Sequence, residues 1–77
     1  MGPGVDRLIA IVAEALRVPP STLTLDTGPD DLQEWDSLAQ INVVSEIEAE
    51  FGVSIPIEQV AEIRHIRDFL GYIEIAS

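Results

Sequence analysis

The chain lacks two residue types on which much protein chemistry depends. It contains no cysteine, so it can form no disulfide, present no thiolate nucleophile and supply no cysteine ligand to zinc. It also has no lysine, because its basic residues are all arginines: Arg7, Arg17, Arg64 and Arg67. Without lysine the chain cannot form a Schiff base, and it cannot carry a biotinyl or lipoyl group through a lysine amide.

Positive charge is scarce, whereas negative charge is plentiful. The chain has 14 Asp and Glu against 4 basic residues, which gives a formal net charge of −10. This charge repels phosphate backbones and anionic membrane surfaces, so we expect no nucleic acid and no membrane among the partners. A hydrophobic content of 47% still supplies enough apolar side chains for a core, which argues against disorder.

The chain is short and has no long hydrophobic run. Its 77 residues predict one domain, residues 1–77, in which residues 1–4 are a candidate remnant of recombinant expression. A domain of this size buries only about 60% of its unfolded surface, which leaves no room for a deep catalytic cleft. The apolar run at residues 8–13 is too short for a signal peptide or a membrane span. We therefore expect a monomeric, cytoplasmic protein.

The hydrophobic spacing predicts an all-α fold, a small four-helix bundle with three longer helices and one short helix. The expected helices cover residues 4–17, the segment between Asp36 and Gly52, residues 57–63 and residues 66–75. Pro19 and Pro20 would end the first helix, Asp36 would cap the second, and Gly52 would end it. The second helix shows a continuous apolar stripe, which predicts its core face: Leu38, Ile41, Val44, Ile47 and Phe51.

A long connection, residues 21–36, joins the first two predicted helices. Loops of this length are uncommon in small domains and are usually functional. Four apolar residues are expected to hold it on the core: Leu23, Leu25, Leu32 and Trp35. Its acidic residues lack the Asp-x-Asp-x-Asp-Gly order of a calcium loop, so we expect a solvated surface and no metal site: Asp26, Asp30, Asp31 and Glu34.

Ser37 is the main candidate for chemistry, because it follows the long connection in the first turn of the second predicted helix. A helix N-terminus offers unpaired N–H groups and positive potential, which would stabilise a phosphate ester on this serine. The alternative is that Ser37 only helps to cap the helix. A nucleophilic role would need a base, yet the single histidine, His65, lies between Arg64 and Arg67 at a helix junction. We therefore expect no catalytic residue.

Two segments together resemble one family, the acyl carrier proteins. The stretch Glu-Trp-Asp-Ser-Leu at residues 34–38 is similar to the family's phosphopantetheine attachment motif, whose core is Asp-Ser-Leu. The stretch Glu-Ala-Glu-Phe-Gly-Val-Ser-Ile-Pro at residues 48–56 is similar to the acidic end of the family's second helix and the apolar segment after it. The resemblance covers about residues 5–75 of an acidic chain of suitable length.

The resemblance implies a carrier and not an enzyme. Ser37 would accept 4′-phosphopantetheine from coenzyme A through a phosphopantetheinyl transferase that uses Mg²⁺, and the thiol of the group would hold acyl chains as thioesters. Asp36 would help to present Ser37. Further partners would load or process the acyl group, as a ligase, an acyltransferase or a ketosynthase does. Two alternatives stay open: a peptidyl carrier loaded with an amino acid, and an unmodified helical adapter.

The resemblance also places partner docking on the second helix. The expected docking residues are Asp36, Leu38, Ala39, Asn42, Val43, Glu46 and Glu50. Carriers of primary fatty-acid synthesis usually have acidic residues where this chain has Ala39 and Asn42. This departure favours a discrete carrier of a specialised pathway, such as polyketide or other secondary-metabolite assembly.

A second departure concerns the junction before the last predicted helix. The family commonly has threonine where this chain has Arg64 and His65, and these residues form a small basic patch with Arg67. We expect the patch to pair with acidic residues of the long connection, the alternative being a contact specific to a partner.

Overall fold

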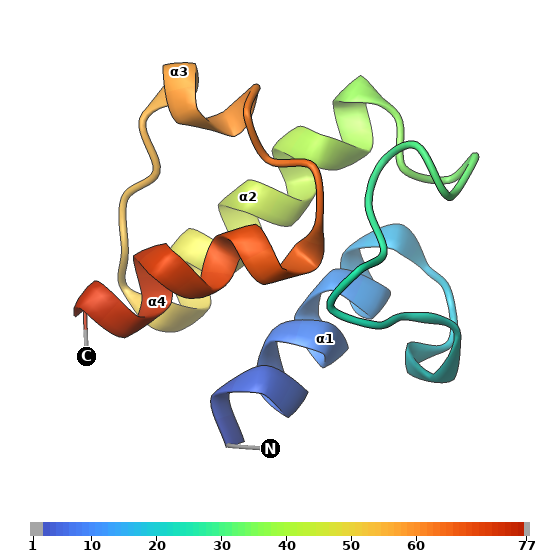
Figure 1. Cartoon of the computed structure of the whole chain (residues 1–77), viewed down its shortest axis with the longest axis horizontal. Helices are drawn as coiled ribbons and strands as arrows, with labels where there is room; N and C mark the ends of the chain where they lie inside the picture. Colours follow the sequence, from blue (N-terminus) through green and yellow to red (C-terminus); the bar gives the residue numbers. More distant parts are fainter. Residues whose placement is uncertain (1–2, 77) are drawn as a thin grey trace.

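The computed structural model describes residues 3–76, and every regular element in this range is helical (Figure 1). In chain order the elements are α1 (Pro3–Leu16), the 3-10 helix η1 (Pro20–Thr22), α2 (Ser37–Phe51), α3 (Ile57–Val60), the 3-10 helix η2 (Ile66–Phe69) and α4 (Leu70–Ala76). The Cα radius of gyration is 11.2 Å. The prediction of a small all-α bundle with a long connection between its first two helices is confirmed.

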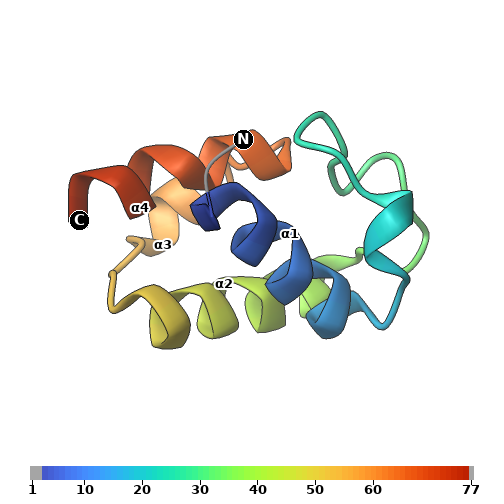
Figure 2. The same ribbon diagram turned by 90° about the horizontal axis from the view of Figure 1, so that it is seen from below.

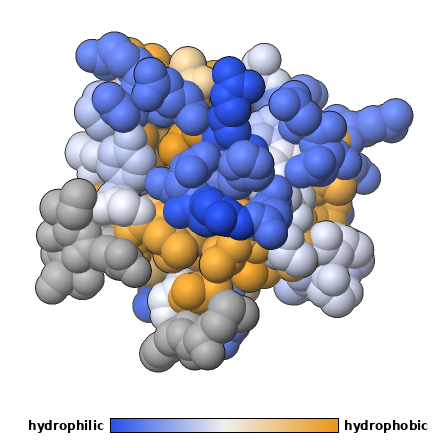
Figure 3. Space-filling model, viewed as in Figure 1, coloured by the Kyte–Doolittle hydropathy of each residue, from blue (hydrophilic) through white to orange (hydrophobic). Residues whose placement is uncertain are grey.

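The helices pack around one core. In Figure 2, α1 lies between α2 on one side and the continuous segment formed by η2 and α4 on the other, and the long connection closes one end. In Figure 3, apolar surface lies between α1 and α4, with polar side chains above it. Among the described residues, no helix combines the length and the apolar character needed to cross a membrane.

The largest fully buried side chains come in pairs from three elements. They are Leu8 and Val12 of α1, Val43 and Ile47 of α2, and Ile66 and Phe69 of η2. Burial of one such side chain stabilises the fold by about 1.5–3 kcal/mol. Since each pair belongs to a different element, the core is built only when the three elements meet.

Both ends of α2 agree with the sequence analysis. The Asp36 carboxylate accepts a hydrogen bond from the Ala39 N–H at 2.8 Å, the usual geometry of an N-cap. Gly52 adopts the left-handed conformation with φ 66°, and its N–H donates to the Glu48 carbonyl at 2.9 Å. These ends depend on contacts within a few residues, which is why the sequence predicted them.

The predicted core stripe of α2 is wrong in the first half of the helix. Leu38 is 69% exposed and Ile41 is 55% exposed, and the buried residues of α2 are Val43, Val44 and Ile47. Ile41 lines an open hollow together with Ile57 and Val60 of the 4-residue helix α3, so it stays exposed there. Helical periodicity identified apolar positions correctly, but it did not show which of them would find a packing partner.

The third predicted helix is also shorter than expected, since α3 ends at Val60 rather than at residue 63. The Asp68 carboxylate accepts hydrogen bonds from the N–H groups of Arg64, at 2.9 Å, and His65, at 3.0 Å. These bonds start η2 at Ile66, so the last helical segment begins as a 3-10 helix before α4 follows.

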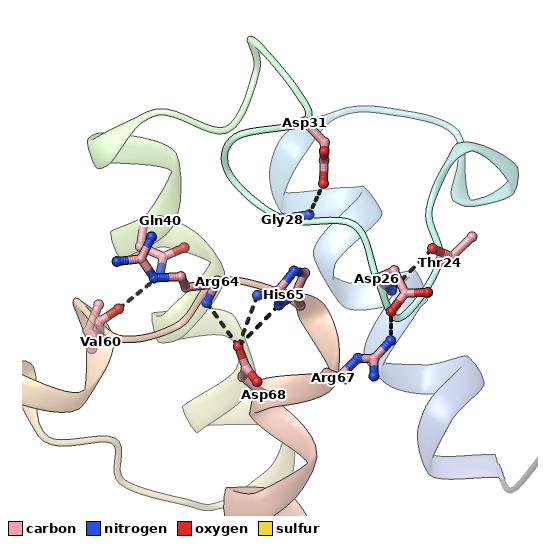
Figure 4. Close-up of polar contacts among 10 residues, drawn as sticks. All are labelled: Thr24, Asp26, Gly28, Asp31, Gln40, Val60, Arg64, His65, Arg67 and Asp68. Carbon is pink, nitrogen blue, oxygen red and sulfur yellow. Dashed lines mark hydrogen bonds and ion pairs between the residues drawn. The ribbon is translucent and has the colours of Figure 1, made fainter.

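The long connection is held on the start of η2 by main-chain and side-chain contacts. The Ile66 N–H donates to the Thr27 carbonyl at 2.9 Å, and the Arg67 N–H donates to the Leu25 carbonyl at 3.0 Å. Arg67 also forms an ion pair with Asp26 (Figure 4). As predicted, apolar residues of the connection pack on the core: Leu23 and Trp35 are buried, and Leu25 and Leu32 are partly buried.

The expected pairing of the basic patch with the connection holds for Arg67 alone. His65 instead lies 3.8 Å from Asp68 of its own element, measured from Nδ1 to Oδ2. The acidic residues of the connection are all exposed, as predicted: Asp26, Asp30, Asp31 and Glu34. Besides Asp26, Asp31 makes an internal contact, since it accepts a hydrogen bond from the Gly28 N–H at 2.8 Å.

Gly28 is the point of closest approach between the connection and the α3–η2 junction. It is buried, and a Cβ atom at this position would collide with the main-chain carbonyl of Arg64. A backbone atom cannot move aside as a side chain can. Gly28 therefore has to be glycine for the connection to lie against the junction.

We predict that Gly28→Ala lowers the free energy of unfolding by about 1–3 kcal/mol, the usual cost of an added group in a filled space. The measurement is equilibrium unfolding in urea. Gly71→Ala in α4 is the matched control, because a Cβ there meets no neighbour and alanine favours helix by about 0.5–1 kcal/mol. Equal stabilities of the two variants would contradict the proposed close approach.

Candidate functional site

Ser37 is the first residue of α2, and its side chain is exposed. The cap of the helix is Asp36, which bonds the Ala39 N–H, so Ser37 is not the capping residue. Among the described residues, none forms a hydrogen bond with the Ser37 hydroxyl. The alternative of a purely capping serine therefore has no support in the geometry.

The N-terminus of α2 is electrostatically suited to an anion beside Ser37. The helix has 15 residues, and its first turn contains no acidic residue. N–H groups in a first turn lack partners within the helix, and the helix dipole adds positive potential there. A phosphate joined to the Ser37 oxygen would thus gain from the free N–H groups and the helix dipole, and these would oppose the repulsion from the neighbouring carboxylates of Asp30 and Asp36.

A hollow of about 630 Å³ opens beside Ser37. One wall is formed by the end of the connection and the start of α2, and the opposite wall by α3 and the segment that follows it. The lining residues are Pro29, Asp30, Trp35, Asp36, Ser37, Gln40, Ile41, Ile57, Val60, Ala61, Ile63 and Arg64. Binding sites for small molecules usually measure about 300–1,000 Å³, so the hollow has room for a chain attached to Ser37.

Gln40 connects the walls of the hollow. Its Oε1 accepts a hydrogen bond of 2.6 Å from the indole N–H of Trp35, and its Nε2 donates to the Val60 carbonyl at 3.2 Å (Figure 4 shows the second bond). One side chain therefore joins the connection, α2 and α3. The sequence analysis gave Gln40 no role, although a tryptophan predicted to be buried requires an acceptor for its N–H group, and that requirement pointed to nearby polar residues.

The predicted docking residues do not all lie on the surface. Most of them are exposed or partly exposed: Asp36, Leu38, Ala39, Asn42, Glu46 and Glu50. Val43 is a correction, because it is fully buried in the core and has no surface with which to contact a partner. It belongs to the face of α2 that packs into the core.

Glu50 is engaged with another helix. Its carboxylate accepts a hydrogen bond from the Arg7 guanidinium of α1 at 2.6 Å, and this guanidinium also lies 5.6 Å from the centre of the Phe51 ring. The sequence of α2 contains no lysine or arginine that could compensate Glu46 and Glu50. The tertiary structure supplies one from α1, so Glu46 is the residue of this pair that stays without an ion-pair partner among those described.

The site contains no arrangement for nucleophilic catalysis. His65 does not line the hollow, and its imidazole faces Asp68 rather than Ser37. Proton abstraction would need a base within hydrogen-bond reach of the hydroxyl. The structure therefore does not bring His65 to the Ser37 hydroxyl as a base.

Comparisons with known proteins agree with this geometry. A model of the phosphopantetheine attachment site family matches residues 6–73. An acyl carrier protein of Rhodococcus erythropolis is 33% identical over 83% of this chain and 70% of its own length, and one of Treponema pallidum is 37% identical over 88% and 87%. The solution structure of a holo acyl carrier protein from Geobacter metallireducens has the same fold, with a TM-score of 0.83 at 20% identity, over 97% of this chain and 86% of that one.

The fold, the exposed serine and the family match define a carrier domain that bears a prosthetic group and performs no catalysis of its own. Within this class, the chain belongs to the acyl carrier protein family. Its cofactor is accordingly covalent 4′-phosphopantetheine. The start of α2 and the adjoining hollow offer this group both positive potential and space.

We predict that Gln40→Leu destabilises the fold by about 1–3 kcal/mol, because it leaves the buried indole N–H of Trp35 without an acceptor. Trp35 is the single tryptophan, so its fluorescence emission reports on this contact directly and should shift. The control is Gln33→Leu, the same substitution at an exposed position of the connection. A Gln40→Leu protein with the stability and emission of the control would show that the contact is unimportant.

Proposed function

We propose that Ser37 carries the 4′-phosphopantetheine group and that the protein presents acyl chains on it to partner enzymes. The observation that supports this most directly is the position of Ser37: an exposed hydroxyl at the start of α2, beside the hollow. A phosphopantetheinyl transferase would attach the group from coenzyme A, a cytoplasmic metabolite, and we place the carrier in the same compartment.

In this proposal the prosthetic group supplies a thiol that holds the acyl chain as a thioester, and the residues of the chain position it. The first turn of α2 stabilises negative charge at the Ser37 oxygen. Asp36 holds the turn in place through its bond to Ala39. Trp35 and Gln40 hold the turn against α3. Since the chain has neither cysteine nor lysine, its side chains supply no competing thiol or amine for the acyl group.

We predict that the protein gains one phosphopantetheinyl mass when it is incubated with coenzyme A, Mg²⁺ and a broad-specificity transferase, and that Ser37→Ala gains none. Intact mass spectrometry measures the addition, and fragmentation locates it. Ser45→Ala, an exposed serine in the same helix, is the matched control and should be modified fully. Equal modification of Ser37→Ala would exclude this site, and an unmodified wild-type protein would favour the unmodified helical adapter.

We further propose that partners contact the exposed apolar residues near Ser37 and the acidic residues further along α2. Leu38 is 69% exposed and directly follows Ser37, while Asn42 and Glu46 lie exposed on the same helix. The partners would be the transferase and enzymes that load or process acyl groups, of the ligase, acyltransferase or ketosynthase type. Apolar contacts next to the serine would depend little on salt, whereas the Glu46 contact would be screened.

We predict that Leu38→Ala lowers kcat/KM of the transferase by at least about fivefold, which corresponds to about 1 kcal/mol of lost interface contact. The free energy of unfolding should stay the same, because the Leu38 side chain is largely exposed. Glu46→Gln is the comparison, and its effect should be present at low salt and vanish at high salt. Unchanged kinetics of Leu38→Ala would remove this residue from the docking surface.

The neutral residues near Ser37 also support a specialised pathway. Ala39 and Asn42 stand where carriers of primary fatty-acid synthesis usually have acidic residues, so a partner selected for basic side chains would find little to bind here. We therefore propose a role in polyketide or other secondary-metabolite assembly. Neighbouring genes for such enzymes would support the role. Genes for amino-acid activation would favour a peptidyl carrier, which shares the arm but differs in cargo.

A further inference from the structure

The hollow beside Ser37 is not uniformly apolar. Its far wall contains Ile57, Val60 and Ile63, whereas its edges carry Arg64, Asp30 and Gln40. Gln40 is already hydrogen-bonded to Trp35 and Val60, but a plain alkyl chain would offer no partner to Arg64, and unpaired polar groups in a contact surface weaken binding. The mixed lining therefore favours a ligand that has both carbon and oxygen atoms.

The guanidinium N–H groups of Arg64 have no ion-pair partner among the described residues, unlike those of Arg7 and Arg67. Arg7 pairs with Glu50 and Arg67 pairs with Asp26, but no carboxylate in the described part of the chain lies within ion-pair distance of the Arg64 guanidinium. A guanidinium carries five N–H donors and no acceptor, so its partners must be oxygen or nitrogen lone pairs. Arg17, the remaining arginine, does not line the hollow.

The main chain of Arg64 is fixed, so its side chain starts from a defined point. Its N–H donates to Asp68 at 2.9 Å, and its carbonyl lies against Gly28. Figure 4 shows the side chain extending from the α3–η2 junction towards Gln40, which also lines the hollow. Gln40 is itself held by Trp35 and Val60. Hydrogen bonds thus hold the main chain of Arg64 and the side chain of Gln40.

The charges of the lining favour a neutral oxygen over a carboxylate. Asp30 and Asp36 line the same hollow as Arg64, so a carboxylate would gain one attraction and meet two repulsions. A ketone or hydroxyl oxygen can accept from the guanidinium without that repulsion. The neighbouring hollow, beyond Ile41, Ile57 and Val60, is more apolar but measures only about 190 Å³ and is not lined by Ser37.

We infer that Arg64 determines cargo specificity: it donates a hydrogen bond to an oxygen of the acyl group held beside Ser37, so that the carrier prefers keto- or hydroxyacyl chains to alkyl chains of equal length. This inference rests on the proposed attachment at Ser37. It assigns to Arg64 a contact with cargo instead of the ion pair with the connection that the sequence led us to expect.

The test compares two acyl groups of equal chain length, acetoacetyl and butyryl, loaded from their coenzyme A thioesters. The rate of thioester hydrolysis is measured for the wild type, Arg64→Ala, Arg64→Lys and Arg17→Ala. Arg64→Ala should speed hydrolysis of the acetoacetyl form by about fivefold, equivalent to about 1 kcal/mol for one hydrogen bond, and leave the butyryl form unchanged. Arg64→Lys should restore part of the protection, and Arg17→Ala should match the wild type.

A spectroscopic measurement distinguishes a direct contact between Arg64 and the acyl oxygen from an indirect effect of the substitution on hydrolysis. The ¹H–¹⁵N signal of the Arg64 Nε–H should shift in the acetoacetyl form relative to the butyryl form, and the Arg17 signal should not. Equal hydrolysis of the two forms in Arg64→Ala and wild type, with no Arg64 shift, would overturn the inference while leaving attachment intact. Failure of any loading at Ser37 would instead overturn the proposed function, and the inference with it.

Discussion

The hydrogen bond between the Trp35 indole and Gln40 is the contact on which the candidate site depends. Trp35 is buried directly before α2 and donates a hydrogen bond to Gln40. Gln40 donates in turn to the Val60 carbonyl of α3. Among the described residues, the bond from Gln40 to Val60 is the hydrogen bond that joins α2 to α3 across the hollow. The indole N–H is buried away from water, so breaking this bond would leave the N–H group without any partner. The free-energy cost of that unpaired donor favours the bonded state.

This acidic chain has only four basic residues, and two of them, Arg7 and Arg67, form ion pairs in different parts of the fold. Arg7 joins α1 to the end of α2, and Arg67 holds the long connection on η2. Both pairs are exposed, so each is worth at most about 1 kcal/mol, and their main effect is on which segments lie together. The main-chain bonds beside Arg67 and the close approach at Gly28 supply the rest of that attachment. Together these contacts fix the path of the long connection.

The prediction of the ends of α2 succeeded because it depended on local features. Asp36, Ser37 and Gly52 are adjacent to helix ends whose geometry is set within one turn, and the structure places Asp36 and Gly52 as the sequence suggested. Val43, Leu38 and Ile41 show the limit of this approach. All are apolar residues on one amphipathic helix, and their burial depends on where α1 and α3 lie, which periodicity along α2 does not contain.

The sequence by itself determined the all-α class, the ends of α2, the anchoring of the connection by Leu23 and Trp35, and the membership of a family that bears a prosthetic group on serine. The tertiary structure alone decided the shortness of α3, the compensation of Glu50 by Arg7 and the bridging role of Gln40. It also decided that Arg64 lies at the edge of the hollow rather than in an ion pair. These features join residues far apart in the chain, so they follow from packing and not from local propensity.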